Sequence, residues 1–417
     1  MFPLAQHIGN PSKSLVQKND RVLVGQIIGA ADGHNSANVI CSCSGRVKAV
    51  EKRRVFFGYL SECVVVENDG QFTPVEGLGR ETDTSSLTAA EILARIRCGG
   101  VVGLGGVGYP THVKLQPPDP EAIRLVIANG AECEPYLTCN DLLMRTEPEA
   151  IVDGLRLLLR LFPNARGVIA IEDNKPQAIS AIRKASAGIK EIRIVEMRTK
   201  YPQGSEHNLI QAVTGITYPV AQHPADVGCL VDNVGTVYAI EQAVAHNRPL
   251  YSHILTVSGD AVRKPGNLLV RDGTSLAEVV EFCGGLKEGT SLKKILSGGP
   301  MMGLALNSLD VPVQKTTNGL LLFSEDPVEL AWKQQTVCLH CGRCARVCPM
   351  GLLPQLLSEA AEAKDYHRFE KKLYGMECVS CGSCTFICPA KRPLMQLFRW
   401  TKAEIRAQQR TAQAGGD

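Results

Sequence analysis

The chain has 417 residues, 44% of them apolar, which is enough for about two to four domains with cores of their own. Its formal net charge is only +3, and this argues against a nucleic-acid-binding protein, which is usually strongly basic. Half of the 16 cysteines lie between Cys338 and Cys388, so the sequence disfavours a secreted disulfide framework and favours a reducing compartment. We find no signal peptide pattern and no apolar run of about 20 residues, so we expect no transmembrane segment.

The first segment reads as a small all-β unit. The stretch "LVQKNDRVLVGQIIGAADG" alternates apolar and polar residues and carries turn signals, as short strands do. Residues 1–75 resemble a lipoyl-like barrel-sandwich, but no lysine stands at the expected hairpin tip, so lipoylation is not expected. Cys41 and Cys43 form a C-x-C pair, for which an incidental pair is favoured over a third metal site.

A glycine-rich stretch, "GGVVGLGGVGYPTHVKL", follows at 99–115. Glycines allow backbone N–H groups to approach a phosphate closely, although such loops are common and weak evidence on their own. No Rossmann strand–helix unit with a ribose-binding acid can be drawn from Gly103 onward. Lys114 is either a phosphate contact or a solvated surface lysine.

The stretch "LVIANGAECEPYL" reads as a buried strand that ends in polar residues. Glu132 and Glu134 flank Cys133 there, and the carboxyl end of a strand in an α/β region is where ligands usually bind. A charged loop without function is the alternative. Helical and strand patterns alternate beyond this point, so we expect an α/β domain over 85–245.

Two further domains are expected in the second half of the chain. Residues 250–305 alternate strand, turn and helix and resemble a β-grasp ligand-binding module. Residues 325–400 carry two cysteine motifs, and a basic helical tail follows at 401–417, with a solvated face favoured over contact with a partner or anionic lipid.

Each cysteine motif has the form C-x2-C-x2-C-x3-C-P, and the two copies are offset by forty residues at every position. The first motif, here the first cassette, consists of Cys338, Cys341, Cys344 and Cys348. The second cassette consists of Cys378, Cys381, Cys384 and Cys388.

This spacing is the bacterial ferredoxin pattern, in which three cysteines bind one 4Fe–4S cluster and the fourth binds the other cluster. We therefore predict crossed ligation, with Cys388 completing the first cassette and Cys348 completing the second. Structural zinc sites usually join two C-x2-C pairs and do not need a third cysteine at this spacing, so zinc and disulfides are disfavoured. Gly342, Gly382 and Ser383 leave backbone N–H groups free to approach the sulfurs.

Six motifs in order ahead of the cassettes resemble one family. They are "GLGGVGYPTHVK", "NGAECEPYL", "IEDNK", "KYPQGSE", "PADVGCLVDNVGT" and "SGGPMMG". Together they look like the C subunit of Rnf-type ion-translocating electron transport complexes, a family related to the NADH-binding flavoprotein subunit of respiratory complex I. The resemblance covers nearly the whole chain.

The resemblance implies a non-covalent FMN, with NADH as the substrate stacked above it. The implied flavin and NADH contacts are Gly103, Gly105, Gly106, Gly108 and Lys114 at the phosphate and ring, Asn129 and Glu132 at the FMN, Glu134 at the NADH ribose, Tyr201, Gly204 and Glu206 beside flavin and nicotinamide, Asn233 and Thr236 on the phosphate side, and Tyr109 stacked on the nicotinamide or adenine. No residue is expected to act as a catalytic acid or base.

The chain departs from the family pattern at two loop positions and at its start. We expect phenylalanine at 109 and alanine at 107, where the chain has Tyr109 and Val107. Tyrosine still stacks, so affinity rather than function is affected. Members usually begin with a further segment containing a Gly-Gly-Ile-His-Pro-like stretch, and its absence here leaves a truncated start and a re-annotated start as the two alternatives.

The sequence therefore predicts a multidomain α/β and α+β protein with a barrel-sandwich, a flavin domain, a β-grasp module and a helical two-cluster domain. Its predicted function is electron input from NADH through FMN and two 4Fe–4S clusters, with ferredoxin at the far end of a membrane complex. It would lie peripherally on the cytoplasmic face, held by partner subunits. The alternative is a soluble flavin/iron–sulfur reductase that serves a cobalamin enzyme or an amino-acid reductase.

Overall fold

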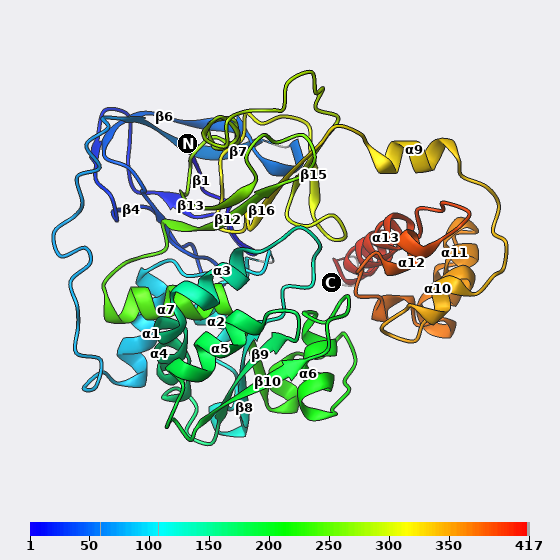
Figure 1. The fold of residues 1–417 in the computed structure, drawn as a ribbon, viewed down its shortest axis with the longest axis horizontal. Helices are drawn as coiled ribbons and strands as arrows, with labels where there is room; N and C mark the ends of the chain where they lie inside the picture. The colour runs from blue at the N-terminus through cyan, green and yellow to red at the C-terminus, as the bar shows by residue number, and fades with distance from the viewer. Residues whose placement is uncertain (59, 107, 415–417) are drawn as a thin grey trace. The chain divides into compact units, whose positions relative to one another are not determined.

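The structure, a computed structural model, describes residues 1–414 except 59 and 107. Val107 and the last three residues of the predicted tail 401–417 therefore lie outside the described residues. The chain forms two compact units, whose elements are labelled in Figure 1. The first unit consists of Met1–Thr199 and Pro224–Ser324, and the second consists of Lys200–His223 and the chain from Glu325 onward.

The first unit begins with two small antiparallel sheets that face each other across a shared core. One sheet has the order β1 (Phe2–Pro3), β7 (Leu60–Asn68), β6 (Gly45–Arg54), β3 (Arg21–Val22), and the other has the order β2 (Lys13–Ser14), β4 (Ile27–Ala30), β5 (Val39–Ile40). A short 3-10 turn, η1 (Phe56–Gly58), joins β6 to β7. Leu4, Ile28 and Val64 are fully buried between the sheets. This arrangement agrees with the barrel-sandwich that the alternation of residues predicts.

A four-stranded parallel sheet follows in the first unit. Its order is β10 (Ile192–Met197), β9 (Arg166–Glu172), β8 (Leu125–Gly130), β11 (Cys229–Asn233). Strands β8 and β9 are almost continuously apolar and buried, which is typical of parallel strands covered by helices, whereas the edge strand β10 is partly exposed.

The helices of this α/β layer pack against one another and against the sheet. They are α1 (Ala89–Cys98), α2 (Thr111–Lys114), α3 (Cys139–Thr146), α4 (Pro148–Leu159), α5 (Pro176–Ala185) and α7 (Val234–Ala245), with 3-10 turns η2 (Pro120–Ala122) and η3 (Pro224–Val227). Helix α4 contacts α5 and α7, so these three cover one face of the sheet (Figure 1). The start of α1 is fixed by a capping box, in which Thr88 and Glu91 each accept the other's backbone N–H.

The last part of the first unit is a five-stranded mixed sheet with one helix. Its order is β13 (Gly266–Arg271), β12 (Ser252–Ser258), β16 (Gly319–Phe323), β14 (Lys294–Ser297), β15 (Leu304–Leu306), and the helix is α8 (Leu276–Phe282). Strands β12 and β16 are parallel and the other pairs are antiparallel. Leu255, Leu276 and Leu320 form the centre of its core.

In the described residues of the second unit, all the regular elements are helices or helical turns. Its elements are α6 (Glu206–Thr214), α9 (Pro327–Lys333), α10 (Arg343–Arg346), α11 (Pro354–Glu362), a π-helical turn η4 (Arg368–Lys372), the 3-10 turn η5 (Gly375–Glu377), α12 (Ser383–Ile387) and α13 (Leu394–Ala414). Phe369 and Phe398 stack at a tilt with ring centroids 6.0 Å apart and are fully buried. The segment Lys200–His223, which falls inside the predicted range 85–245, belongs to this unit.

Candidate functional site

The order in which the chain adds strands to the parallel sheet reverses at β8. The chain runs from β8 to β9 and β10 on one side, and then returns to place β11 on the other side of β8. Asn129, next to the end of β8, and Asn233, the last residue of β11, lie opposite each other in the register. Ligands of open α/β sheets bind at this kind of switch point, beyond the carboxyl ends of the strands.

The glycine loop, residues 99–109, is closed by its own backbone and held by helix α7. The Gly103 N–H donates to the Tyr109 carbonyl at 2.9 Å, and the Gly108 N–H donates to the Gly103 carbonyl at 3.1 Å. The Leu104 N–H donates to the Thr236 hydroxyl at 2.9 Å. The loop therefore stands at the amino-terminal end of α7, close to the switch point.

Three glycines of this loop have room for a methyl group, and Gly106 borders open space. A methyl group added to Gly103 or Gly105 would have its nearest neighbour at 3.7 or 3.6 Å, and one added to Gly106 would meet nothing within 4 Å. Bare backbone beside open space, next to the N-terminus of a 12-residue helix, suits a phosphate or a flavin ring. The residues present therefore fit a flavin nucleotide.

Gly108 has a different environment from the other three glycines. A methyl group added there would lie 2.7 Å from the Thr316 side chain, and its φ is +70°. Gly108 therefore allows the loop to pack against the turn at 314–317. Tyr109 beside it directs its hydroxyl to the Asn35 side chain at 3.4 Å.

The two predicted acidic residues are both engaged by backbone amides. Glu132 is buried and accepts from the N–H groups of Asn140 and Asp141, at the start of α3, at 2.9 and 3.2 Å. Burial raises the pKa of Glu132, while these bonds and Lys175, 3.5 Å away, favour the charged form. Its carboxylate thus caps a helix beside the switch point.

Glu134 ties the flavin domain to the β-grasp module. Its carboxylate accepts from the N–H groups of Met301 and Met302 at 3.0 and 2.8 Å. A methyl group on Gly299 would lie only 2.1 Å from the same carboxylate, so the glycine there permits the contact. The motif "SGGPMMG" is therefore the docking partner of the acidic loop.

The remaining predicted residues of the first unit lie around the same strand ends. The Lys114 ammonium donates to the Val231 carbonyl and lies 3.5 Å from the Asp232 carboxylate. The Asn129 side chain accepts from the Ala131 N–H at 3.0 Å, and the Asn233 side chain caps α7 by accepting from Gly235 at 2.8 Å. Their polar atoms shape the site through bonds to the chain itself.

A buried lysine lies behind the glycine loop and was not found by the sequence reasoning. Lys315 is 1% exposed, and its ammonium donates to the carbonyls of Asn38 and Gly100, both at 2.6 Å. Gly100 has a φ of +62°, and a methyl group on it would lie 2.5 Å from the Asn38 carbonyl. Lys315 thus joins the β-grasp module, the barrel-sandwich and the start of the glycine loop.

We predict that Lys315→Met changes the pH dependence of stability. Burial lowers the pKa of Lys315 from 10.5 to about 8, with Asp272 opposing the shift. Between these pH values the unfolded chain binds more protons than the folded chain, so this lysine makes stability rise with pH, by roughly 3 kcal/mol in all. The difference in Tm between parent and variant should grow in the parent's favour from pH 7.5 to pH 10.

Lys18→Met, at an exposed lysine of the same unit, is the control for this measurement. Its Tm difference from the parent should stay constant over the same pH range. A constant difference for Lys315→Met as well would show that burial does not lower the pKa of Lys315.

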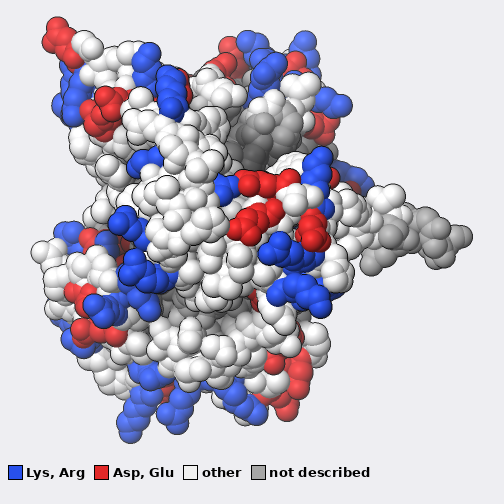
Figure 2. Space-filling model, turned by 90° about the vertical axis from the view of Figure 1, so that its right-hand side faces the viewer, with Lys and Arg blue, Asp and Glu red and all other residues white. Residues whose placement is uncertain are grey.

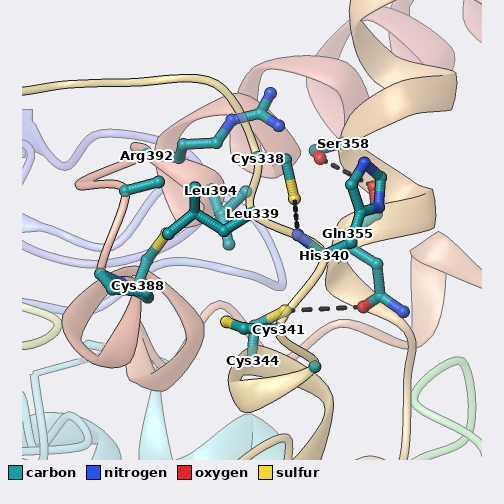
Figure 3. A pocket seen from close by; sticks show the side chains of 13 residues that line it. Cys338, Leu339, His340, Cys341, Cys344, Gln355, Ser358, Cys388, Arg392 and Leu394 are labelled. Atoms are coloured by element: carbon teal, nitrogen blue, oxygen red, sulfur yellow. Dashed lines mark hydrogen bonds between the residues drawn. The ribbon is translucent and has the colours of Figure 1, made fainter.

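In the second unit the cysteines line two separate hollows. Cys338, Cys341, Cys344 and Cys388 line the first hollow (Figure 3). Cys348, Cys378, Cys381 and Cys384 line the second. Each set takes three cysteines from one cassette and the fourth from the other cassette, as the crossed assignment predicts.

The thiols of each set surround a space instead of converging on one point. In the part of the chain that the structure describes, no three His, Cys, Asp or Glu side chains are arranged to hold a single metal ion. A hollow lined by four cysteines in the ferredoxin spacing suits a group of several atoms, and the residues present fit an iron–sulfur cluster. Within the described residues, no third His, Cys, Asp or Glu side chain is placed to share a metal ion with Cys41 and Cys43. The Cys41 thiol instead donates to the Cys43 carbonyl at 3.1 Å.

The two cassette loops repeat the same backbone geometry. His340 and Ser380 occupy equivalent positions, both have a φ near +50°, and their N–H groups donate to the sulfurs of Cys338 and Cys378, each at 3.4 Å. Gly342 and Gly382 adopt positive φ as the N-caps of α10 and α12. Such N–H···S bonds help to set the reduction potential of a bound cluster.

Tyr201, Gly204 and Glu206 belong to the second unit. The Tyr201 hydroxyl donates to the Cys381 carbonyl at 2.6 Å, and the Val220 N–H donates to the Glu377 carboxylate at 2.7 Å. His207 and Tyr218 stack within the segment, with ring centroids 4.3 Å apart. The segment predicted to line the flavin therefore packs on the second cassette.

We predict that Tyr201→Phe loosens the segment Lys200–His223. The variant loses one hydrogen bond, worth about 1 kcal/mol, so local opening should become more frequent. Limited proteolysis within this segment should be faster than in the parent. Tyr374→Phe, at a tyrosine 64% exposed in the same unit, should leave the rate unchanged, and equal rates for both variants would contradict the prediction.

Among the described residues, no helix is both long and apolar enough to cross a bilayer. On the face drawn in Figure 2, basic and acidic side chains are interspersed, which matches the small net charge of the whole chain.

Four family models match consecutive parts of the chain. They are the RnfC barrel sandwich hybrid domain at 1–71, the Nuo51 FMN-binding domain at 96–242, the SLBB domain at 254–305 and the 4Fe-4S dicluster domain at 337–392. The chain is thus a mixed α/β multidomain protein, and its domains include one of the FMN-binding type and one of the 4Fe-4S dicluster type.

Several characterised proteins are similar over nearly the whole chain. The C subunit of the proton-translocating ferredoxin:NAD(+) oxidoreductase complex of Clostridium ljungdahlii is 42% identical over 408 residues, 97% of this chain and 88% of that protein. The C subunit of the Na(+)-translocating complex of Acetobacterium woodii is 39% identical, covering 98% and 91%. The C subunit of the ion-translocating oxidoreductase complex of Pseudomonas aeruginosa is 40% identical, and the chain covers 52% of its length.

Among solved structures, an NAD+-reducing [NiFe]-hydrogenase in the H2-reduced state has a similar fold. The TM-score is 0.51 at 21% identity, covering 77% of this chain and 66% of that chain. At this identity the likeness concerns the fold alone.

Proposed function

Because this chain belongs to the family of C subunits of ion-translocating ferredoxin:NAD(+) oxidoreductase complexes, we propose that it carries electrons between NADH and the other subunits of such a complex through one FMN and two 4Fe–4S clusters. As in its relatives, the chain is a subunit of an oxidoreductase. The proposal adds the count of clusters, the substrate NADH and the residues that hold each group.

The observation that carries the proposal is the sorting of the eight cassette cysteines into two sets of four around two hollows. Two clusters can carry electrons only if a donor reduces them. The glycine loop at the switch point supplies a site for that source in the same chain.

The residues of the flavin site would act by binding and orientation. FMN, when bound, supplies the conversion of a two-electron hydride donor into single electrons. The open backbone at Gly103, Gly105 and Gly106 and the N-terminus of α7 would bind its phosphate. Tyr109 would offer an aromatic face for stacking.

We propose that the side chains of this site serve binding and positioning and not acid–base chemistry. Glu132 and Glu134 are already bonded to backbone amides, and we propose that they hold the loops around the nucleotides in place. The chain would thus set distances, potentials and solvent exclusion, while the hydride acceptor and electron carriers are the bound groups.

An anaerobic titration of the purified, reconstituted chain with NADH tests the proposal. Flavin absorbance should bleach first, and the EPR signals of reduced clusters should follow. If dithionite reduces the clusters and NADH does not, the electron source lies elsewhere and the proposal fails.

We further propose that the chain lies peripherally on the cytoplasmic face of a membrane, held there by partner subunits. The names of the relatives, all subunits of ion-translocating complexes, support this. The similarity over 97 to 98% of the chain also favours this function over the alternative of a soluble cobalamin or amino-acid reductase partner.

A further inference from the structure

The two cassette loops have the same backbone geometry but very different surroundings. The first loop, Val337–Cys341, is exposed: Val337 is 82% and Leu339 60% accessible, and Cys341 itself is exposed. The residues forty positions later form the second loop, Glu377–Cys381, in which Cys381 is 8% accessible. The repeat therefore has one open and one covered loop.

The cover of the second loop comes from within the same unit. Tyr201 and Val220, from the segment Lys200–His223, bond to Cys381 and Glu377 as described above. The Lys402 ammonium of α13 also donates to the carbonyls of Met376 and Cys378, at 3.1 and 2.6 Å. The second loop thus shows what covers a cassette loop in this protein: a polypeptide segment that bonds to its backbone and acids.

The exposed first loop lies in a stretch that carries only positive charge. Between residues 330 and 358 the sequence contains no Asp or Glu, and its charged residues are Lys333, Arg343 and Arg346. Arg343 and Arg346 are exposed and lie three residues apart on α10, which places them on one side of that helix. Exposed apolar side chains that lie within nine residues of exposed basic ones in the chain match an acidic partner surface.

We propose that Val337, Leu339, Arg343 and Arg346 form a docking surface for an acidic one-electron redox protein, which makes the cluster of the first cassette the exit for electrons. The inference rests on the proposed function. In the transfer, the docked protein's centre is reduced by the one electron that the first-cassette cluster loses, and no bond is made or broken. A small apolar centre with charged residues around it is typical of transient electron-transfer contacts.

The test uses the full reconstituted chain with NADH as donor and three acceptors. The acceptors are cytochrome b5, an acidic haem protein, cytochrome c, a basic one, and a small neutral quinone. In Arg343→Glu/Arg346→Glu, the rate of cytochrome b5 reduction at low ionic strength should fall about tenfold or more, because attraction becomes repulsion. Cytochrome c reduction should become faster, and quinone reduction should not change.

Lys371→Glu/Lys372→Glu is the matched control, since it reverses two exposed positive charges elsewhere in the same unit. Its cytochrome b5 rate should stay within about twofold of the parent, because surface charges away from the contact are largely screened. An equal fall in both double variants would mean that net charge and not this surface governs the encounter, and would overturn the proposal.

A second pair of variants tests the apolar part of the surface. Val337→Ser should slow cytochrome b5 reduction several-fold at every ionic strength. Leu269→Ser, at a leucine 76% exposed in β13, should not. If Val337→Ser instead slows the reduction of the clusters by NADH, the loop serves a contact inside the chain and the proposal is wrong.

The two levels of proposal fail separately. If NADH reduces no cluster in the parent, the proposed function fails, and the docking surface can still be measured by mixing dithionite-reduced protein, freed of excess dithionite, with cytochrome b5. If NADH reduces the clusters in the parent and in Arg343→Glu/Arg346→Glu alike, while the cytochrome b5 rates are equal, the docking surface alone is refuted.

Discussion

Cys388→Ala is expected to remove the cluster of the first cassette and to leave the cluster of the second cassette in place. Cys388 belongs to the second cassette in sequence but lines the hollow formed by Cys338, Cys341 and Cys344. Loss of one of four thiolates destabilises a cluster strongly, so iron should fall from about eight to about four atoms per chain. Iron analysis and the EPR spectrum of the reduced protein measure the loss.

Double variants decide which cluster is lost. Cys341→Ala added to Cys388→Ala should cause no further loss of iron, because both residues serve the first hollow. Cys381→Ala added to Cys388→Ala should remove the remaining iron, because Cys381 lines the second hollow. The reverse pattern would show that each cassette holds its own cluster without crossing.

Gly105→Ala should abolish or strongly weaken FMN binding while the protein folds normally. A methyl group at this position would have the Asn233 side chain as its nearest neighbour, at 3.6 Å, which is an ordinary contact, so no strain is expected within the protein. The same methyl group would occupy the open space at the loop in which we place the flavin phosphate. We expect the Kd for FMN to rise about tenfold or more, which corresponds to about 1.4 kcal/mol or more.

The Kd is measured by quenching of FMN fluorescence on titration with flavin-free protein, and Tm is measured in parallel. Gly266→Ala, in β13, is the control, because a methyl group there has no neighbour within 4 Å and so should cause no strain either. An unchanged Kd in Gly105→Ala would move the flavin away from this loop. A fall in Tm as large as the one expected for a buried clash would mean that the open space is not present.

The cassettes could be predicted from the sequence because their geometry is local. Three cysteines at a fixed pitch, with Gly342 or Gly382 in the left-handed conformation, determine the loop, and the repeat at forty residues supplies the fourth ligand. The strand at 125–130 and the polar residues after it were likewise visible as a buried run that ends in Asn129. The parallel sheet then places Asn129 opposite Asn233.

The rest depended on contacts between distant segments, which a single sequence does not encode. Lys315 lies about 200 residues from the glycine loop that it supports, and nothing in its neighbourhood distinguishes it from a surface lysine. Lys315 lies in the turn at 314–317, in which the Gln314 N–H donates to the Thr317 hydroxyl, but a turn of this kind does not predict a buried lysine.

The acidic loop shows the same limit in another way. The sequence identified Glu132 and Glu134 as unusual but could not show that their carboxylates are bonded to the amides of α3 and of Met301 and Met302. These partners lie on elements whose approach depends on the packing of the whole unit. The roles of both residues toward FMN and NADH remain predictions.

The segment Lys200–His223 belongs to the second unit although it lies within the part of the sequence that forms the first unit, and this limits where the chain can be cut. The cluster-bearing unit is completed by residues that lie more than 100 positions before its first cassette, so it is not a detachable tail. An excised fragment beginning at Glu325 would lack the Tyr201 and Val220 contacts and would keep only the contacts of α13 on the second cassette loop. Gene fusion or fission at this boundary would therefore conserve the eight cassette cysteines but not the full cover of the second cassette loop.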